Sequence, residues 1–484
     1  MIPVIAAIVA AEFTGDFTVQ IRYVTLLAVI AGLANVAAAQ AQSVETGPVA
    51  APTLGDWFDQ AKVTGTVRSF YFDRMYGAPG VSNQSAYSLA GILNVQSAPF
   101  LDGFEVGTSF FTAQSLSANN TEGAPGYPHL DATLMGPRNS ITSLGQAFIQ
   151  YRNKLVLVRL GDQLLNTPWM SPSDSRVLPA TYQAGFVQLD PLPGLSLYGL
   201  RELRWKSRTS DNYYQDNLYY PSTFDGDSAY GGAAALGANA SKTQGTLAFG
   251  GAYAAHGIKA DAWYYDFYDF AAMAYTDASY TFKTGTGIDP FIAGQYLRET
   301  GSNSVLNGNR GGTAIDGYKG NGVDATAFGF QTGITYAIDR GIFGDGSIAL
   351  SYNNLPGHTG SVGDGAIVSP FTVGYATDPL YTTATLRGLV ELGPGDAAKL
   401  AVTQYMLDKQ IIAVVGITKF NTRLEGSNNE VDLDLTYAPG GRFKGLSIRD
   451  RLEVSNASYI YNNGATGNRG HSFVYNRVML QYNF

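Results

Sequence analysis

The chain has 484 residues, of which 14% are charged, and it carries a formal net charge of −8 and no cysteine. A soluble protein of this length usually has about 25% charged residues, and a helical membrane protein needs apolar runs of roughly 20 residues, which are missing after residue 40. The composition therefore argues against both classes. It also excludes disulfides and thiolate metal sites, and the acidic balance makes nucleic acid a poor partner.

The N-terminal segment has the features of a secretory signal. Arg22 precedes an apolar stretch that ends in small residues suited to cleavage. We expect residues 1–39 to be a signal peptide, with a membrane anchor as the alternative. Residues 1–21 contain a second apolar stretch and two acidic side chains, which a signal does not need. We therefore expect translation to begin nearer Tyr23, so that residues 1–21 are a misannotated start.

Residues 40–61 form a short polar lead, which we expect to lie in the periplasm. Over residues 62–484, segments of roughly 9–14 residues alternate between apolar and polar side chains, as in VDLDLTY at 431–437. The connections between these segments alternate between short and long. This pattern predicts an antiparallel transmembrane β-barrel of about eighteen strands, with short periplasmic turns and long extracellular loops.

Two segments near the end of this pattern are harder to divide into strands. We predict the fourteenth strand around residues 386–392, with Leu386, Val390 and Leu392 facing lipid. Residues 399–421 are interpreted as one long strand, although two strands fit as well. The last strand covers residues 475–484 and ends on Phe484. Its alternation resembles the C-terminal signal by which outer-membrane proteins engage the barrel-assembly machinery.

Several segments resemble the OprD family of outer-membrane porins. They are the opening strand GTVRSFYFDR at 65–74, the hairpin at 86–107, the segment 168–185, the motif SPFTVGYATDPLYT at 369–382 with Tyr375 and Asp378, and KGLSIRDR at 444–451. The resemblance implies an eighteen-stranded barrel in the outer membrane, a lumen narrowed by loops folded inward, and passage of small solutes. It also favours a monomer, and many members prefer carboxylate-bearing substrates.

Strand parity predicts which arginines face the lumen, because successive side chains of a strand point to opposite faces. An arginine on the lipid face would cost roughly 2–4 kcal/mol near the membrane midplane. The arginines predicted to face inward are Arg68, Arg74, Arg159, Arg387, Arg449, Arg451 and Arg477.

Two interpretations of these arginines remain open. In one they form a basic track that binds and passes a carboxylate, because guanidinium groups bind carboxylates at two points. In the other they are wall charges paired with neighbouring acids. A hairpin turning near residues 441–442 would pair Asp434 with Arg449 and Asp432 with Arg451.

The segment 168–185, which is similar to the inward-folded third loop of the family, is expected to form a constriction. Asp174 would then face the arginines, or it would pair with Arg176 or cap a turn. The four histidines are isolated, so we expect no metal site, no cofactor and no enzyme activity.

The sequence therefore predicts a passive channel for small anionic or zwitterionic solutes, such as amino acids, peptides or organic acids. The alternatives are a weakly selective porin with structural arginines and, less favoured, a barrel enzyme or an adhesin.

Overall fold

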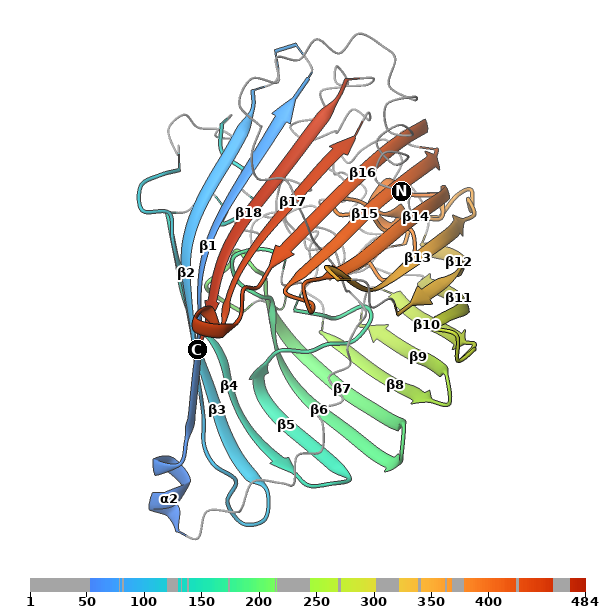
Figure 1. Cartoon of the computed structure of the whole chain (residues 1–484). Coiled ribbons are helices and arrows are strands. Elements are labelled where there is room, and N and C mark those ends of the chain that lie inside the picture. The colour runs from blue at the N-terminus through green and yellow to red at the C-terminus, as the bar shows by residue number, and fades with distance from the viewer. Residues whose placement is uncertain are drawn as a thin grey trace.

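The computed structural model describes residues 53–484 except 78, 81, 120–128, 132, 137–138, 173–174, 214, 216–243, 269–270, 302–321, 338–340, 362–363, 368–377, 424–425 and 456–470 (Figure 1). In this part of the chain eighteen strands form one antiparallel sheet. Each strand pairs with the next along the sequence, and β1 pairs with β18 as well as with β2. The sheet is therefore a closed barrel, as the alternating pattern predicts.

The strands are 8 to 15 residues long. They are β1 (Lys62–Tyr76), β2 (Gln84–Gln96), β3 (Phe104–Gln114), β4 (Ser140–Arg152), β5 (Val156–Gln163), β6 (Thr181–Leu192), β7 (Leu195–Lys206), β8 (Thr246–Ala255), β9 (Ile258–Phe267), β10 (Ala271–Thr281), β11 (Ile288–Gly301), β12 (Val323–Tyr336), β13 (Phe343–Leu355), β14 (Gly395–Met406), β15 (Ile411–Thr422), β16 (Gly426–Tyr437), β17 (Leu446–Ser455) and β18 (Phe473–Asn483).

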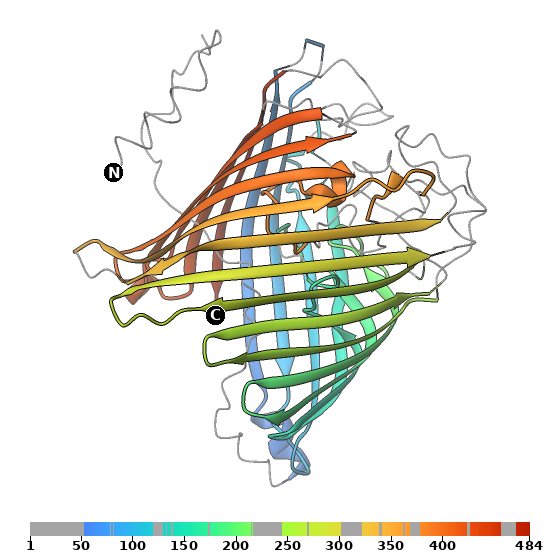
Figure 2. The same cartoon turned by 90° about the vertical axis from the view of Figure 1, so that its right-hand side faces the viewer.

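The connections differ systematically in length. The eight that follow even-numbered strands span two to eight residues, whereas six of the nine that follow odd-numbered strands span 17 or more. Figure 2 shows several of the short turns together at one end of the strands. This asymmetry is the one expected of an outer-membrane barrel, with short turns on the periplasmic side.

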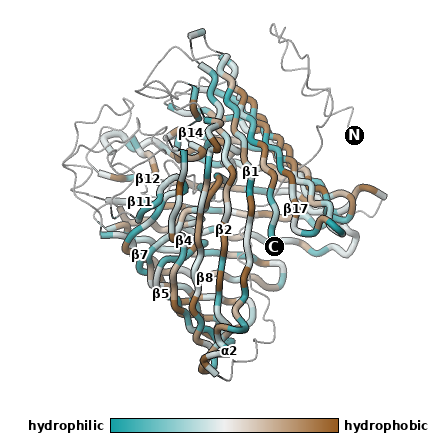
Figure 3. The backbone as a smooth tube through the Cα atoms, turned by 90° about the vertical axis from the view of Figure 1, so that its left-hand side faces the viewer, coloured by the Kyte–Doolittle hydropathy of each residue, from teal (hydrophilic) through white to brown (hydrophobic). Residues whose placement is uncertain are grey.

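Side chains alternate between the two faces of the wall. On β1, Val63, Val67 and Tyr71 are 56%, 45% and 44% exposed, whereas Arg68 and Arg74 are 4% and 1% exposed. Hydrophobic and hydrophilic residues accordingly alternate along the strands in Figure 3. The outer face is apolar because it meets lipid, and the polar side chains face the lumen.

Phe484 closes the barrel at the periplasmic end of β1. The backbones of Phe484 and Gly65 exchange two hydrogen bonds of 2.9 Å. A Cβ on Gly65 would lie 2.3 Å from the Phe484 ring, so the ring packs where only glycine leaves room. The terminal aromatic is therefore part of the seam between the first and last strands.

Two of the predicted strands are assigned wrongly. Residues 399–421 fall in two strands, β14 and β15, joined by a turn in which Leu407, Asp408 and Lys409 have positive φ. Residues 386–392 belong to no strand. They lie in the β13–β14 connection, which ends in the short helix α4 (Leu389–Leu392). The two errors cancel in the strand count.

Long connections fold into the barrel and fill much of its lumen. The β13–β14 connection buries Leu389 and Val390, and the β5–β6 connection buries Trp169, all at 0% exposure. These side chains pack in one apolar cluster with inward-facing residues of the wall such as Tyr265. The prediction that extracellular loops fold into the lumen is therefore confirmed.

One further helix, α2 (Leu54–Asp59), precedes the barrel at the end of β1 (Figure 1). Thr53 caps it by accepting a hydrogen bond of 3.1 Å from the backbone N–H of Asp56. Its Trp57 ring stacks on Phe100, in the short β2–β3 connection, at 5.6 Å between centroids. No helix in the described ranges is both long and apolar enough to cross a membrane.

Candidate functional site

Five of the seven predicted arginines share one side of the lumen. Arg68 and Arg74 lie on β1, Arg477 lies on the adjacent β18, and Arg449 and Arg451 lie on β17. All five positions have the inward parity of their strands, so the side chains gather on three neighbouring strands. We call these five residues the arginine wall.

A small cavity lies among three members of this wall. Arg449, Arg451 and Arg477 line a cavity of about 10 Å³, which is room for about one water molecule. Register places Arg477 directly opposite Arg451. The other lining residues are Phe70, Met479 and Ser175, the last of which belongs to the inward-folded β5–β6 connection.

Arg477 is stacked on aromatic rings, and it interacts electrostatically with the Glu453 carboxylate. Its guanidinium carbon lies 4.2 Å from the centroid of the Tyr475 ring and 5.5 Å from that of Phe72. The side chain is 2% exposed, and its Nη2 has no hydrogen-bond partner among the described residues. Stacking fixes the orientation of the guanidinium and leaves N–H donors for another acceptor.

Arg449 and Arg451 share a single carboxylate. Asp434 accepts hydrogen bonds from Nε and Nη2 of Arg449 at 2.8 Å and 2.6 Å, and from Nε of Arg451 at 3.0 Å. Around the 10 Å³ cavity, three guanidinium groups therefore meet the Asp434 carboxylate, and Glu453 is a further acid that interacts with Arg477.

The predicted pairing of acids with arginines is correct only in part. Arg449 does contact Asp434, but it does so diagonally, because Asp434 lies opposite Arg451 and Asp432 lies opposite Glu453. The register is shifted by two residues from the predicted one, because Tyr437 at the end of β16 lies opposite Ile448 and not opposite Leu446, the first residue of β17. The connection between the two strands contains the 3₁₀ turn η3 (Gly441–Phe443).

Arg68 and Arg74 hold inward-folded connections in place. Nη1 of Arg68 donates to the backbone carbonyl of Arg176 at 2.9 Å, and its Nε donates to Gln481 at 2.8 Å. Arg74 forms an ion pair with Asp131 of the β3–β4 connection at 2.9 Å, with both side chains at or below 1% exposure. A buried pair of this kind fixes the position of the loop that supplies the acid.

Arg387 faces the lumen but not from a strand. Leu386, Val390 and Leu392, predicted to face lipid, are instead 4%, 0% and 2% exposed. The apolar and polar residues of this segment do alternate, but its apolar side chains pack against other buried side chains inside the barrel. Strand parity cannot distinguish this apolar environment from lipid. Arg387 donates to Ser455 at 3.2 Å and lies 3.7 Å from the Glu430 carboxylate.

Arg159 lies apart from the arginine wall. It is on β5, where its Nε donates to Gln150 at 2.8 Å and its guanidinium carbon lies 4.4 Å from the centroid of the Phe148 ring. These partners are all on β4. Strand parity predicted that Arg159 faces the lumen. Parity carries no information about which strands lie near one another across the lumen.

The predicted constriction residues have different outcomes. Arg176 is 3% exposed and donates to the backbone carbonyl of Thr133 at 3.0 Å, so it joins two inward-folded connections. Asp174 and Tyr375 lie outside the described residues. Asp378 is described and accepts a hydrogen bond of 2.9 Å from the backbone N–H of Leu380.

Two buried carboxyl groups of the β13–β14 connection have perturbed pKa values. Burial raises the pKa of the Asp378 carboxyl. Burial, and secondarily the negative charge of Asp378, raise the pKa of the Glu391 carboxyl of α4. Glu391 also accepts a hydrogen bond of 2.9 Å from the backbone N–H of Gly388.

Several residues of the lumen were not predicted from the sequence. Arg208, just beyond the end of β7, is 0% exposed and donates to the Ser175 hydroxyl at 3.0 Å. Asp131, the partner of Arg74, lies in a connection with no periodicity to place it. The alternation of β16 and β17, by contrast, could have located the inward carboxylates Glu430 and Glu453.

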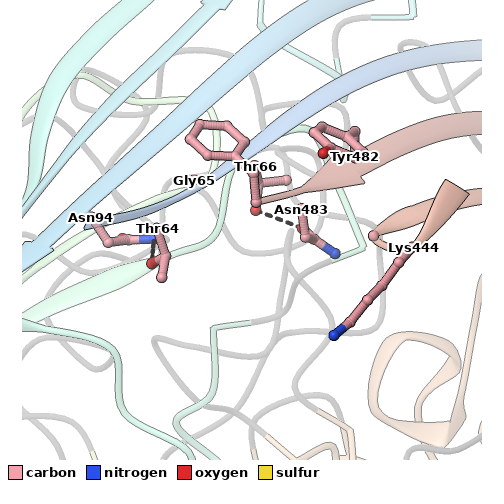
Figure 4. Close-up of a pocket in the computed structure, with 9 residues that line it drawn as sticks. Thr64, Gly65, Thr66, Asn94, Lys444, Tyr482 and Asn483 are labelled. Carbon is pink, nitrogen blue, oxygen red and sulfur yellow. Dashed lines mark hydrogen bonds between the residues drawn. The ribbon is translucent and has the colours of Figure 1, made fainter. Parts of the chain in front are cut away.

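A wider cavity of about 610 Å³ opens at the periplasmic end of the seam (Figure 4). Thr64 and Thr66 of β1 contribute to its lining together with Asn483 of β18, and Thr66 donates to Asn483 at 2.8 Å. Lys444, from the β16–β17 connection, contributes the positive charge of this lining. Arg68 of the arginine wall lies two residues beyond Thr66 on the same face of β1.

Comparison with known protein families shows which family the chain matches. Residues 55–335, more than half of its length, match the family described as outer membrane porin, OprD family. The chain belongs to the OprD family. It is therefore an outer-membrane porin, as its barrel architecture independently indicates. No curated protein matches the sequence.

Solved barrels of Pseudomonas aeruginosa share the fold of this OprD-family porin. OccK9 (OpdG) has a TM-score of 0.66 at 16% identity, with 88% of this chain and 99% of that chain covered. OpdK with vanillate has a TM-score of 0.63 at 14% identity, with 88% of this chain and 99% of that chain covered. OccK2 (OpdF) in complex with glucuronate has 0.62 at 16% identity, with the same coverage.

Proposed function

We propose that this porin is a passive diffusion channel for small carboxylate-bearing solutes, which the arginine wall guides through the constriction. The observation that carries the proposal is the cluster of Arg449, Arg451 and Arg477 around one small cavity, where Asp434 pairs with Arg449 and Arg451 but not with Arg477. A solute whose carboxylate reaches this cluster meets planar N–H donors suited to two-point binding.

The seven predicted arginines do not contribute equally to this proposal. Arg477 is the best candidate to contact a solute, because its Nη2 has no partner among the described residues. Arg68 and Arg74 are assigned mainly to holding the loops that shape the path. Arg159 and Arg387 are outside the cluster, so they are no longer proposed as members of one continuous track.

Several weak sites in series favour transit over trapping. Arg68, which lies next to the cluster on β1, is a further positive charge along the wall, whereas the charge of Arg74 is paired with Asp131. The solutes that two neighbouring structures hold, vanillate and glucuronate, are consistent with a carboxylate as the shared feature. No cofactor is required, because the solute moves down its own gradient.

A second candidate is a weakly selective porin whose arginines are structural. It is favoured by the contacts of Arg68 and Arg74, both of which bind loop atoms. Single-channel current of the purified protein, measured with benzoate and with the uncharged benzamide as competitors, separates the two functions. Benzoate should block the current far more strongly than benzamide under the first, and equal block would refute it.

A further inference from the structure

Three carboxylates lie together on the lumen face of β16 and β17. Glu430, Asp432 and Glu453 are 0%, 5% and 1% exposed, and register places Asp432 directly opposite Glu453. One carboxylate oxygen of each residue lies within 4.8 Å of the others. Like charges directly opposite one another destabilise a sheet, so this arrangement requires compensation. We call these three residues the carboxylate cluster.

The protein supplies few hydrogen bonds to this cluster, although Lys399, Arg387 and Arg477 add positive charge near it. Asp432 Oδ2 accepts from the backbone N–H of Thr385 at 3.2 Å, and Glu430 Oε1 accepts from that of Leu386 at 3.2 Å. Nε of Arg387 lies 3.7 Å from Glu430 Oε2, which is longer than a hydrogen bond. Both N–H groups and the guanidinium come from the inward-folded β13–β14 connection.

Glu453 gives an independent indication of a ligand. It is buried within the described structure, and neither of its carboxylate oxygens has a hydrogen-bond partner there. The second oxygens of the other two acids, Oε2 of Glu430 and Oδ1 of Asp432, also lack partners. Asn428, two residues before Glu430 on the same face of β16, is 3% exposed with both amide atoms unpartnered.

We propose that the carboxylate cluster binds one divalent cation, for which calcium is the best fit. Calcium takes six to eight oxygen ligands at 2.3–2.6 Å, so ligands on opposite sides of the ion are roughly 5 Å apart, and three oxygens that lie within 4.8 Å of one another can reach the same ion. Four unpartnered carboxylate oxygens converge from three residues. Magnesium usually keeps several waters and takes only one or two carboxylates, which fits this set less well.

The cation would join the barrel wall to the inward-folded loop. Two of its ligand residues already accept hydrogen bonds from Thr385 and Leu386, so neutralising the cluster would let that loop pack against the wall. The cluster lies beside the arginine wall, since Glu453 is two residues from Arg451 on the same face of β17. The site stands independently of the proposed transport function, because its occupancy can be measured without any solute.

The test is calorimetric titration of calcium chloride into the full-length barrel, purified in detergent and freed of metals with EDTA. We expect one calcium site per chain. Glu453→Gln should weaken its affinity about tenfold or more. The matched control is Glu202→Gln, which neutralises a single buried lumen carboxylate on β7 and should leave the affinity unchanged.

Absence of any calcium, magnesium or manganese binding to the wild-type barrel would overturn the proposal, because the carboxyl groups would then be neutralised by protons or by the nearby cations. Unchanged affinity in Glu453→Gln would also overturn it, since the site would lie elsewhere. If this variant does not fold, as judged by heat-dependent mobility in electrophoresis, a wild-type crystal soaked in manganese chloride decides. Anomalous density among the three carboxylates would support the site, and its absence there would refute it.

Discussion

Replacing Arg477 with glutamine should remove the main contact between the wall and a carboxylate solute. Arg477 is 2% exposed, stacked on Tyr475, and retains an unpartnered Nη2. A hydrogen bond between charged groups contributes about 1.5–3 kcal/mol, and each 1.4 kcal/mol is a factor of ten in affinity. We therefore expect benzoate to block the single-channel current with an affinity roughly 10- to 150-fold weaker in R477Q.

The matched control is Arg159→Gln. It removes the same charge from another lumen-facing arginine, but from β5, whose partners Gln150 and Phe148 are remote from the cluster. R159Q should change the benzoate affinity less than about threefold, which corresponds to under 1 kcal/mol. A third variant, Arg477→Lys, keeps the charge but loses the planar fork, and should fall between the wild type and R477Q.

The measurement is single-channel recording in planar bilayers with benzoate at increasing concentration, after each variant is shown to fold by its heat-dependent electrophoretic mobility. Equal loss of block in R477Q and R159Q would show that only the summed lumen charge matters. Unchanged block in R477Q would show that this arginine is structural. Either result would refute the reasoning that stacking and an unpartnered donor mark the solute contact.

Three further variants test the architecture. Gly65→Val should displace the Phe484 ring, because a Cβ there would lie 2.3 Å from it, and lower stability by about 1–3 kcal/mol; an unchanged temperature of the heat-dependent mobility shift would contradict this. Asp131→Asn leaves Arg74 buried without its counter-charge and should cost about 3–5 kcal/mol, read from thermal unfolding; a loss below about 1 kcal/mol would show that the pair does not hold the loop. Because the pKa of Glu391 is raised, the folded state binds this proton more tightly than the unfolded chain does. The contribution of Glu391 to stability should therefore be largest below the ordinary carboxyl pKa of about 4 and should fall as pH rises toward the raised value. Glu391→Gln should flatten this decline in melts between pH 4 and pH 8, and a decline as steep as in the wild type would assign it to other groups.

The sequence by itself determined the barrel and the faces of its strands. Lipid and lumen impose opposite demands on successive residues, so Val63 and Val67 on one face and Arg68 on the other follow from a local rule. The same rule located the inward arginines of β17 and β18. The short and long connections were also readable, because turn residues interrupt the alternation.

Tertiary structure decided what the inward side chains contact. Residues 386–392 alternate like a strand, yet their apolar side chains pack inside the lumen, because burial among folded loops satisfies them as well as lipid does. The separation of Arg159 from Arg477, the pairing of Arg74 with Asp131, and the meeting of Glu453 with Asp432 all depend on curvature, register and loop paths. These are long-range properties, and a periodicity of two residues carries no information about them.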